Sequence, residues 1–157
     1  MSALERLKAE RKLFRRERNE GFSAKPITTK NGELNLFMWN AKIPGKKKTP
    51  FEDGLYSVTL KFPKDYPQQP PTAIFTPPIF HANVYEDGEV CLSLLNIEKD
   101  WKPSISVNTI LKSLQNFLDD PNAEDPANSE AFSLFKHSQE MYNEKVRNQA
   151  KQFKPID

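Results

Sequence analysis

Apolar residues recur with a period of two in the first half of the chain. Between residues 56 and 62 apolar side chains alternate with Ser57, Thr59 and Lys61. This alternation is typical of an antiparallel strand with one buried face and one solvated face. The segment 36–43 is rich in apolar and aromatic residues, and 72–75 forms a shorter apolar segment. The pattern therefore predicts three strands.

Turn-forming residues separate these predicted strands. Asn31-Gly32 is a hairpin signal, and a longer basic loop extends from Pro44 to Gly54. Six prolines then fall between residues 63 and 78, and they disfavour regular structure over most of 63–90. Irregular segments longer than about 12–15 residues in a compact domain are usually functional. The segment 63–90 is therefore where we expect a site.

A helical period governs the N-terminal end of the chain. Leu4, Leu7 and Phe14 recur at helical spacing, and Ser2 begins a capping-box pattern. The segment 1–18 is therefore predicted to be an amphipathic helix that docks these three apolar residues on the domain.

The last third of the chain also has a helical period. Its three predicted helices are one that begins near Ser106 and ends at Asp119-Asp120-Pro121, a short one that begins at Asn128 or Ser129, and a longer one over about 138–153. Apolar residues line one face of the first over 110–118, and Phe132 and Phe135 are expected to point inward from the second. A helix, then strands, then a long loop and helices predict an α+β domain with an antiparallel sheet.

Length and composition exclude several classes of protein. The 157 residues fit one domain, 1–157, which is large enough to fold without a disulfide or a structural metal. A single cysteine permits no internal disulfide, and with no signal peptide evident we expect a reducing, intracellular compartment. No apolar run approaches ~18 residues, no glycine-rich phosphate loop occurs, and His81 and His137 lack zinc-ligand spacing. We therefore expect no membrane span, cofactor or metal.

Basic charge is concentrated at the N-terminal end. Residues 1–18 hold seven Lys and Arg against three Glu, a net charge of +4, whereas the whole chain carries +2. Arg11, Arg15 and Arg18 lie three or four residues apart and would share the polar face of the predicted helix. This face is either an ordinary solvated surface or a site for an acidic protein partner. Nucleic acid is a weaker interpretation, because no base-stacking aromatic residues interleave with these charges.

The candidate chemistry centres on Cys91, the only cysteine in the chain. A thiol is well suited to carry an acyl group as a thioester, and an amide such as that of Asn83 can donate to the oxyanion that forms when the thioester is attacked. Two alternatives stand beside acyl transfer. A lone cysteine is more often a small buried apolar residue. A cysteine hydrolase would require a base, and the spacing of His81 from Cys91 matches no hydrolase motif.

Several runs of residues resemble the ubiquitin-conjugating enzyme family over nearly the whole chain. They are Tyr66-Pro67-Gln68-Gln69-Pro70-Pro71, Phe80-His81-Ala82-Asn83-Val84-Tyr85, Gly88, Cys91-Leu92-Ser93 and Trp101-Lys102-Pro103. Within that family the chain is most similar to SUMO-conjugating enzymes. The residues that carry this closer similarity are the basic first helix, Ile43-Pro44-Gly45-Lys46-Lys47, Thr49-Pro50-Phe51-Glu52, Glu98-Lys99-Asp100-Trp101 and Asp125-Pro126-Ala127.

The resemblance implies a fold and an activity. The implied fold is a single catalytic domain with an N-terminal helix, a four-stranded antiparallel sheet, a long irregular active-site segment and C-terminal helices. Cys91 would take SUMO from its activating enzyme as a thioester and transfer it to a substrate lysine as an isopeptide. The implied partners are SUMO, the SUMO-activating enzyme, SUMO ligases and substrate proteins, for a monomer of the nucleus and cytoplasm. A ubiquitin-conjugating enzyme and a non-catalytic binding variant of this fold are the alternatives.

The resemblance also implies roles for individual residues. Asn83 would donate to the oxyanion or brace the active-site loop, while Asp125 and Tyr85 would flank the acceptor lysine, orient its amine and help to desolvate it. In the matching motif His81 is structural. Arg11, Arg15 and Arg18 would bind SUMO or the activating enzyme. The substrate groove would be lined by Thr72, Ile74, Asp87, Glu89, Lys99, Pro126 and Ala127.

The chain departs from the family pattern near the expected groove. Ala82 stands where the family has the proline of His-Pro-Asn, which frees φ at this position and lowers the expected rigidity of the loop. SUMO-conjugating enzymes have two lysines and two small hydroxyl residues near the groove, where this chain has Thr72, Ile74, Asp87 and Glu89. We therefore expect only a weak preference for an acidic residue after the target lysine.

Overall fold

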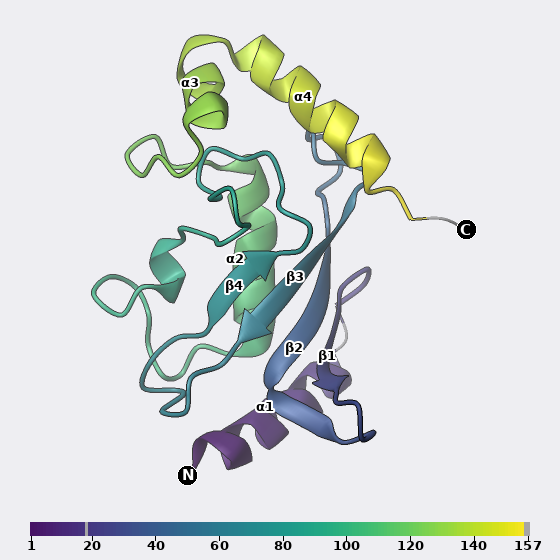
Figure 1. Ribbon diagram of the computed structural model, residues 1–157, viewed down its shortest axis with the longest axis vertical. Coiled ribbons are helices and arrows are strands. Elements are labelled where there is room, and N and C mark those ends of the chain that lie inside the picture. The colour runs from purple at the N-terminus through teal and green to yellow at the C-terminus, as the bar shows by residue number, and fades with distance from the viewer. Residues whose placement is uncertain (18, 156–157) are drawn as a thin grey trace.

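A computed structural model describes residues 1–17 and 19–155 (Figure 1). The elements follow one another as expected for an α+β domain. They are α1 (Ala3–Glu17), β1 (Ser23–Thr28), β2 (Leu34–Pro44), β3 (Leu55–Lys61), β4 (Thr72–Phe75), a 3-10 turn (Ser93–Leu95), α2 (Val107–Asp119), α3 (Ser129–His137) and α4 (Gln139–Gln152). None of the described helices is long and apolar enough to cross a membrane.

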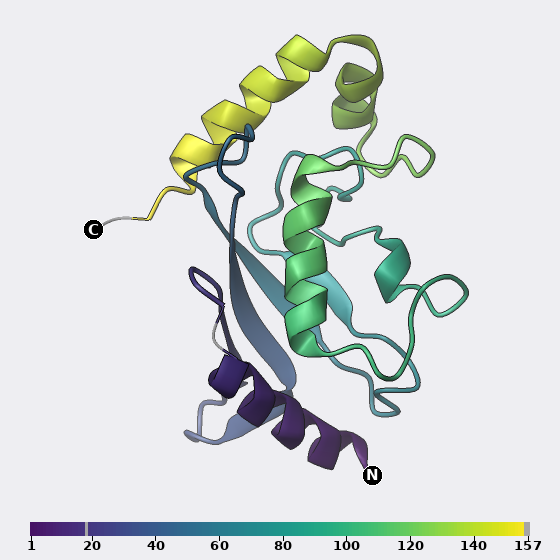
Figure 2. The same cartoon turned by 180° about the vertical axis from the view of Figure 1, so that it is seen from behind.

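Four antiparallel strands form one sheet in the order β1-β2-β3-β4. Trp39 pairs with Leu60, and Ala41 pairs with Val58, so that apolar side chains of neighbouring strands face the same side. All four are buried, which confirms the strands predicted from alternation. Helix α2 crosses this buried face, with α1 at one end of the sheet and α3 and α4 at the other (Figure 2).

Strand β1 was not predicted from the residue pattern. Its sequence, Ser-Ala-Lys-Pro-Ile-Thr, shows no alternation of apolar and polar residues and contains Pro26, which disfavours a strand. The strand lies at the edge of the sheet and pairs only with β2, with a shift of register between Pro26 and Ile27. An edge position and an irregular register both tolerate a residue without a backbone N–H.

Helix α1 begins as predicted, but its buried face is different. The Ser2 hydroxyl accepts a hydrogen bond from the Glu5 backbone N–H at 3.1 Å, as an N-cap does. Leu4 is 42% exposed, so its predicted inward position is wrong. The buried residues are Leu7, Glu10 and Phe14. The acid Glu10 can be buried because its carboxylate accepts hydrogen bonds from the first N–H of α2, at Val107 (2.8 Å), and from Arg6 Nε (3.0 Å). The bond to Val107 joins α1 to α2.

The C-terminal helices match their predicted starts. Ser106 caps α2 by accepting from Thr109 N, and Asn128 caps α3 by accepting from Ala131 N. The apolar face of α2 is buried as expected. In α3 the fully buried residue is Ala131, whereas Phe132 stays half-buried beneath the Lys136 ammonium, 5.4 Å from its ring centroid. The predicted inward position of Phe132 is therefore wrong, because the short helix turns a smaller side chain toward the core.

Candidate active site

A tight turn places Cys91 at the surface. Tyr85 N donates to Glu89 O (2.9 Å) and Gly88 N donates to Tyr85 O (2.9 Å). Gly88 has φ of +94°, and a Cβ there would lie 2.2 Å from Phe75 O, so only glycine fits. The chain then reverses direction and runs antiparallel to residues 83–84, so that Cys91 N donates to Asn83 O at 3.0 Å. The turn thus places Cys91 beside Asn83, the amide residue singled out from the sequence.

The Cys91 thiol is partly exposed and lies between two hollows. One, of about 370 Å³, separates Cys91 from α2 and is lined there by Ser113 and Asn116. The other, called the cleft below, has a volume of about 530 Å³ and is lined by residues that include Tyr85, Lys99 and Asp125. An extended segment can therefore approach the sulfur from one side and a second group from the other.

The electrostatic surroundings keep Cys91 protonated at rest. Burial raises the pKa of the thiol, the Asp125 carboxylate raises it further, Lys99 lowers it, and Glu89 raises it. A cysteine hydrolase needs the opposite arrangement, in which a base or cation lowers the pKa of its cysteine. The surroundings of Cys91 therefore do not favour a hydrolase.

His81 does not supply the missing base. It is fully buried, its ring stacks on Phe117 with centroids 4.2 Å apart, and burial lowers its pKa to about 4. Its Nδ1 accepts from Asn83 N at 3.0 Å, so Nε2 carries the proton and donates to Phe117 O at 2.8 Å. Both ring nitrogens are used to hold the backbone, which supports the structural role expected for His81.

The amide of Asn83 joins the active-site turn to the loop that follows α2. Its Nδ2 donates to Asn122 O (2.8 Å) and to Asp125 O (2.6 Å), and its Oδ1 accepts from Asn122 N (2.7 Å). The side chain is fully buried, and both hydrogens of its NH₂ group are engaged. Of the two roles left open for Asn83, this geometry favours the brace over the oxyanion donor.

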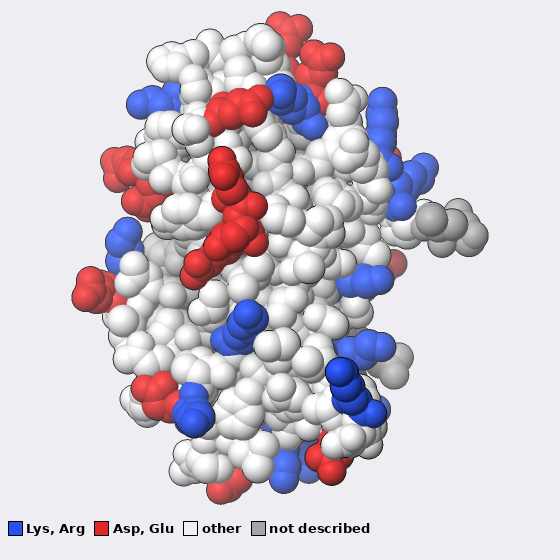
Figure 3. Space-filling view, viewed as in Figure 1, with Lys and Arg blue, Asp and Glu red and all other residues white. Residues whose placement is uncertain are grey.

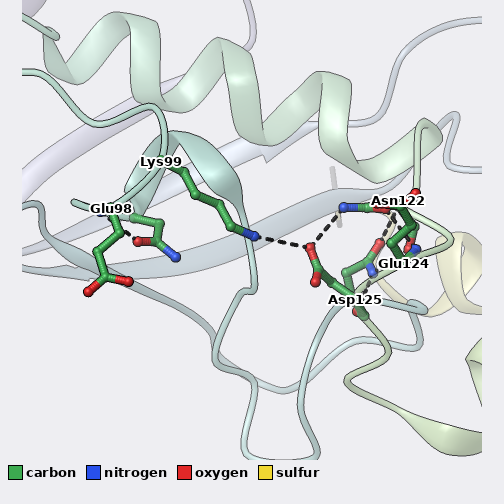
Figure 4. Close-up of polar contacts among 7 residues, drawn as sticks. Glu98, Lys99, Asn122, Glu124 and Asp125 are labelled. Atoms are coloured by element: carbon green, nitrogen blue, oxygen red, sulfur yellow. Dashed lines mark hydrogen bonds and ion pairs between the residues drawn. The ribbon is translucent and has the colours of Figure 1, made fainter.

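Asn83 thereby positions Asp125, whose side chain faces the cleft. Its Oδ2 accepts from Asn122 Nδ2 at 2.8 Å and lies 3.6 Å from Lys99 Nζ (Figure 4). Asn122 was not singled out from the sequence. The available signal was an amide three residues before the acid in a Pro-Asn-Ala-Glu-Asp run, a spacing that favours local side-chain bonds.

Ala82 is held firmly despite the missing proline. Its backbone O accepts from Ala127 N (3.0 Å) and Asn128 N (3.3 Å), and its N–H, which proline would lack, donates to Tyr142 Oη (3.4 Å). These bonds offset the freedom that alanine gains in φ, and they tie the active-site loop to α4 through Tyr142.

Only part of the predicted substrate groove comes together. Another hollow, of about 560 Å³, is lined by Tyr85, Glu86, Asp87, Glu89, Ala127 and Ser129. Figure 3 shows acidic side chains over this region between β4 and α3. Lys99 lies instead on the other side of Tyr85, with Cys91 and Asp125. Thr72, Ile74 and Pro126 are not among the residues that line the described hollows, although Ile74 forms a backbone bridge with Glu89.

A second candidate site lies at the C-terminal end of α1. A hollow of about 840 Å³ is lined by the aromatic Phe14 and Phe22 and by three basic residues and one acid, which are Arg15, Lys25, Lys42 and Glu20. Arg11 is half-buried one turn earlier on the helix, and Arg18 lies outside the described residues. Among the described residues, no group of three or more His, Cys, Asp or Glu side chains is placed to hold a metal ion.

Comparison with known proteins identifies the family. The family model described as ubiquitin-conjugating enzyme matches residues 6–150. The chain belongs to this family. A SUMO-conjugating enzyme of Dictyostelium discoideum is 47% identical over 96% of this chain and 94% of its own length. Those of Caenorhabditis elegans and Arabidopsis thaliana are 47% and 43% identical, over 92% and 94% of this chain and 87% and 92% of their own lengths. The sheet and its flanking helices are the ubiquitin-conjugating fold.

Proposed function

We propose that this ubiquitin-conjugating enzyme conjugates SUMO, carrying it as a thioester on Cys91 and transferring it to substrate lysines. The observation that carries the proposal is the cleft itself. A partly exposed thiol lies beside an aspartate that is held by Asn83, in a chain 43–47% identical to three SUMO-conjugating enzymes.

The chemistry needs no cofactor, because a thioester already stores the energy of the new bond. The Cys91 sulfur displaces the thiol of the activating enzyme from the C-terminal carbonyl of SUMO, forming one S–C bond as another breaks. A substrate ammonium then loses one proton to solvent and attacks the same carbonyl as a neutral amine. The C–N bond forms, the C–S bond breaks, and the departing Cys91 thiolate takes up the second proton that the nitrogen releases. The protein's contribution is orientation and electrostatic stabilisation.

Asp125 is suited to orient the amine. It is partly exposed in the wall of the hollow that contains Cys91, and a carboxylate attracts the ammonium form of the acceptor. A carboxylate is a poor base for an ammonium, so we assign positioning to Asp125. Tyr85, 44% exposed in the same hollow, can cover the aliphatic stem of the lysine.

The proposal extends to partners and location. SUMO, the SUMO-activating enzyme, SUMO ligases and proteins with acceptor lysines are the proposed partners, and the enzyme is proposed to act as a monomer without nucleic acid or membrane. The nucleus and cytoplasm are its proposed location. Light scattering of the purified protein tests whether it is a monomer, and imaging of a fluorescent fusion tests its location.

A charging assay tests the function. The protein is incubated with the SUMO-activating enzyme, ATP and SUMO, and separately with ubiquitin and its activating enzyme, and each reaction is resolved with and without reductant. A reductant-labile SUMO adduct supports the proposal. Charging with ubiquitin alone would reassign the modifier, absence of any adduct would indicate a binding variant, and cleavage of a conjugate would indicate a hydrolase.

Charge reversal on α1 tests the second candidate site. Arg11→Glu with Arg15→Glu is expected to weaken non-covalent binding of SUMO by about tenfold at low ionic strength, with a smaller effect in salt, because long-range attraction to an acidic partner is screened. Titration calorimetry at two salt concentrations measures this. Lys12→Glu with Arg16→Glu is the matched control, since it makes the same change of charge on α1 without altering Arg15, which lines the hollow. Equal losses in both double variants would indicate a general charge effect.

Neutralising the acidic hollow tests substrate preference. Asp87 and Glu89 repel a substrate carboxylate with the strength of exposed charge pairs, which changes rates by up to about fivefold each. Asp87→Ser with Glu89→Thr is therefore expected to raise the preference for an acidic residue after the target lysine. The serine hydroxyl can replace the Asp87 carboxylate that accepts from Glu89 N at 2.9 Å, so the turn is kept.

Rates on two peptides that differ only at this acid give the preference. Glu98→Gln is the control, because it removes an acid that points away from Asp125 (Figure 4). A strong acidic preference in the unmodified enzyme would refute the expected repulsion.

A further inference from the structure

The acceptor side of the cleft already contains an ammonium group. Lys99 Nζ lies 3.6 Å from Asp125 Oδ2, and both residues line the hollow that contains Cys91. Asp125 is the group that the proposed function assigns to the substrate's amine. Lys99 therefore presents to Asp125 the same chemical group that an acceptor lysine brings.

The backbone of the Lys99 loop is anchored by hydrogen bonds, whereas the side chain of Lys99 is half exposed. Lys99 N and Trp101 N both donate to Asn96 O, at 3.0 and 3.2 Å. The buried Trp101 indole donates to Pro67 O at 2.9 Å, which fixes the end of the loop. The Lys99 side chain is 50% exposed, and its four-carbon stem can swing into solvent without disturbing these bonds.

We propose that Lys99 is a built-in competitor for the acceptor position, and that a substrate lysine must displace it from Asp125 before transfer. The proposal rests on the function proposed above. Two ammonium groups on one carboxylate would repel each other, so binding of the acceptor and the Lys99–Asp125 contact exclude one another. The exchange replaces one ammonium by another and leaves the charge of the cleft almost unchanged.

The expected effect is on acceptor affinity. An internal competitor raises the apparent KM for the acceptor. The factor is one plus the equilibrium constant for forming the Lys99–Asp125 contact. For a half-exposed ion pair this factor is about two to six. At saturating acceptor the contact is already displaced, so kcat is expected to stay unchanged.

Single-turnover discharge of the preformed SUMO thioester to free L-lysine measures this split. Lys99→Met removes the charge and keeps a long apolar stem, and it is expected to lower KM about two- to sixfold with kcat unchanged. Lys99→Arg keeps a cation for Asp125 and is expected to keep KM high. Lys102→Met, at an exposed lysine three residues along the chain, is the control for loss of one positive charge near the cleft.

A double-mutant cycle separates displacement of Lys99 from Asp125 from a general electrostatic effect of the Lys99 charge. Asp125→Asn is introduced alone and together with Lys99→Met. If Lys99 acts through Asp125, the Lys99→Met change has no effect on KM in the Asp125→Asn background. An undiminished KM effect in that background, or the same decrease in Lys102→Met, would overturn the proposal in favour of simple repulsion.

The proposed function and this inference fail in different ways. If the protein accepts no SUMO from the activating enzyme, the proposed function is refuted before discharge is measured. If it charges and discharges normally, and Lys99→Met has the KM of the unmodified enzyme, then only the competition by Lys99 is refuted.

Discussion

Replacement of Cys91 by serine is expected to abolish lysine transfer. Cys91 is the only thiol of the chain, so no other residue can carry a thioester. Serine can still accept the SUMO carbonyl, but the resulting oxyester has an alkoxide leaving group, which departs far less readily than a thiolate. We expect a stable SUMO adduct that survives reductant and is not discharged by lysine, measured on gels after charging.

Cys91→Ala is the matched control for this experiment. It lacks any nucleophile at this position, and we expect no adduct with or without reductant. Both variants should unfold at the same urea concentration as the unmodified protein, since the side chain is small and partly exposed. Lysine transfer that persisted in Cys91→Ser would refute the thioester mechanism.

Replacement of Asn83 by alanine is expected to separate the two half-reactions. Charging needs the Cys91 thiol, and the bond from Cys91 N to Asn83 O (3.0 Å) uses a backbone atom that alanine keeps. The role proposed for Asp125 in transfer requires this residue to stay in place, and Asn83 holds its backbone through Nδ2 at 2.6 Å. We expect charging to persist and transfer to slow by about 10²-fold, the scale for misplacing a reacting group by about 1 Å.

If Asn83 braces the loop rather than donating to the oxyanion, a further result is expected. If Asn83 acts by positioning Asp125, then Asp125→Ala will slow transfer much less in the Asn83→Ala background than in the unmodified protein. Asn83→Ala also leaves the carbonyls of Asn122 and Asp125 without their buried donor, and should lower the free energy of unfolding by about 1–3 kcal/mol. Fully additive losses in transfer would favour the oxyanion donor instead.

Neither Cys91 nor His81 supplies a base that could activate water against a thioester. Cys91 has a raised pKa, and His81 is locked into the core as a neutral ring with its pKa lowered to about 4. Water bound near the thioester would find no base among these two residues. An amine is intrinsically more nucleophilic than water, so a site that orients without activating favours lysine over hydrolysis.

Much of the fold could be predicted from the sequence, because its signals are local. Alternation over 56–62 follows from strand geometry, and Ser106 caps α2 because a hydroxyl satisfies an N–H within three residues. Local reasoning was wrong where a distant partner decides burial. Leu4 has the right spacing, but Glu10 is buried because the first N–H of α2 requires an acceptor. Strand β1 forms because β2 offers it a backbone edge, not because its own residues favour a strand.

The sequence by itself determined the family, the only cysteine and some of the residues that gather near it, because these rest on residue identity in contiguous runs. Tertiary structure alone decided how those residues are arranged. The hydrogen bonds of the Asn83 amide reach Asn122 and Asp125, which lie 39 and 42 residues further along the chain. The Lys99–Asp125 contact likewise brings together two loops. Such pairings depend on how α2 and the sheet position the loops that they connect, and no local pattern of apolar and polar residues encodes that arrangement.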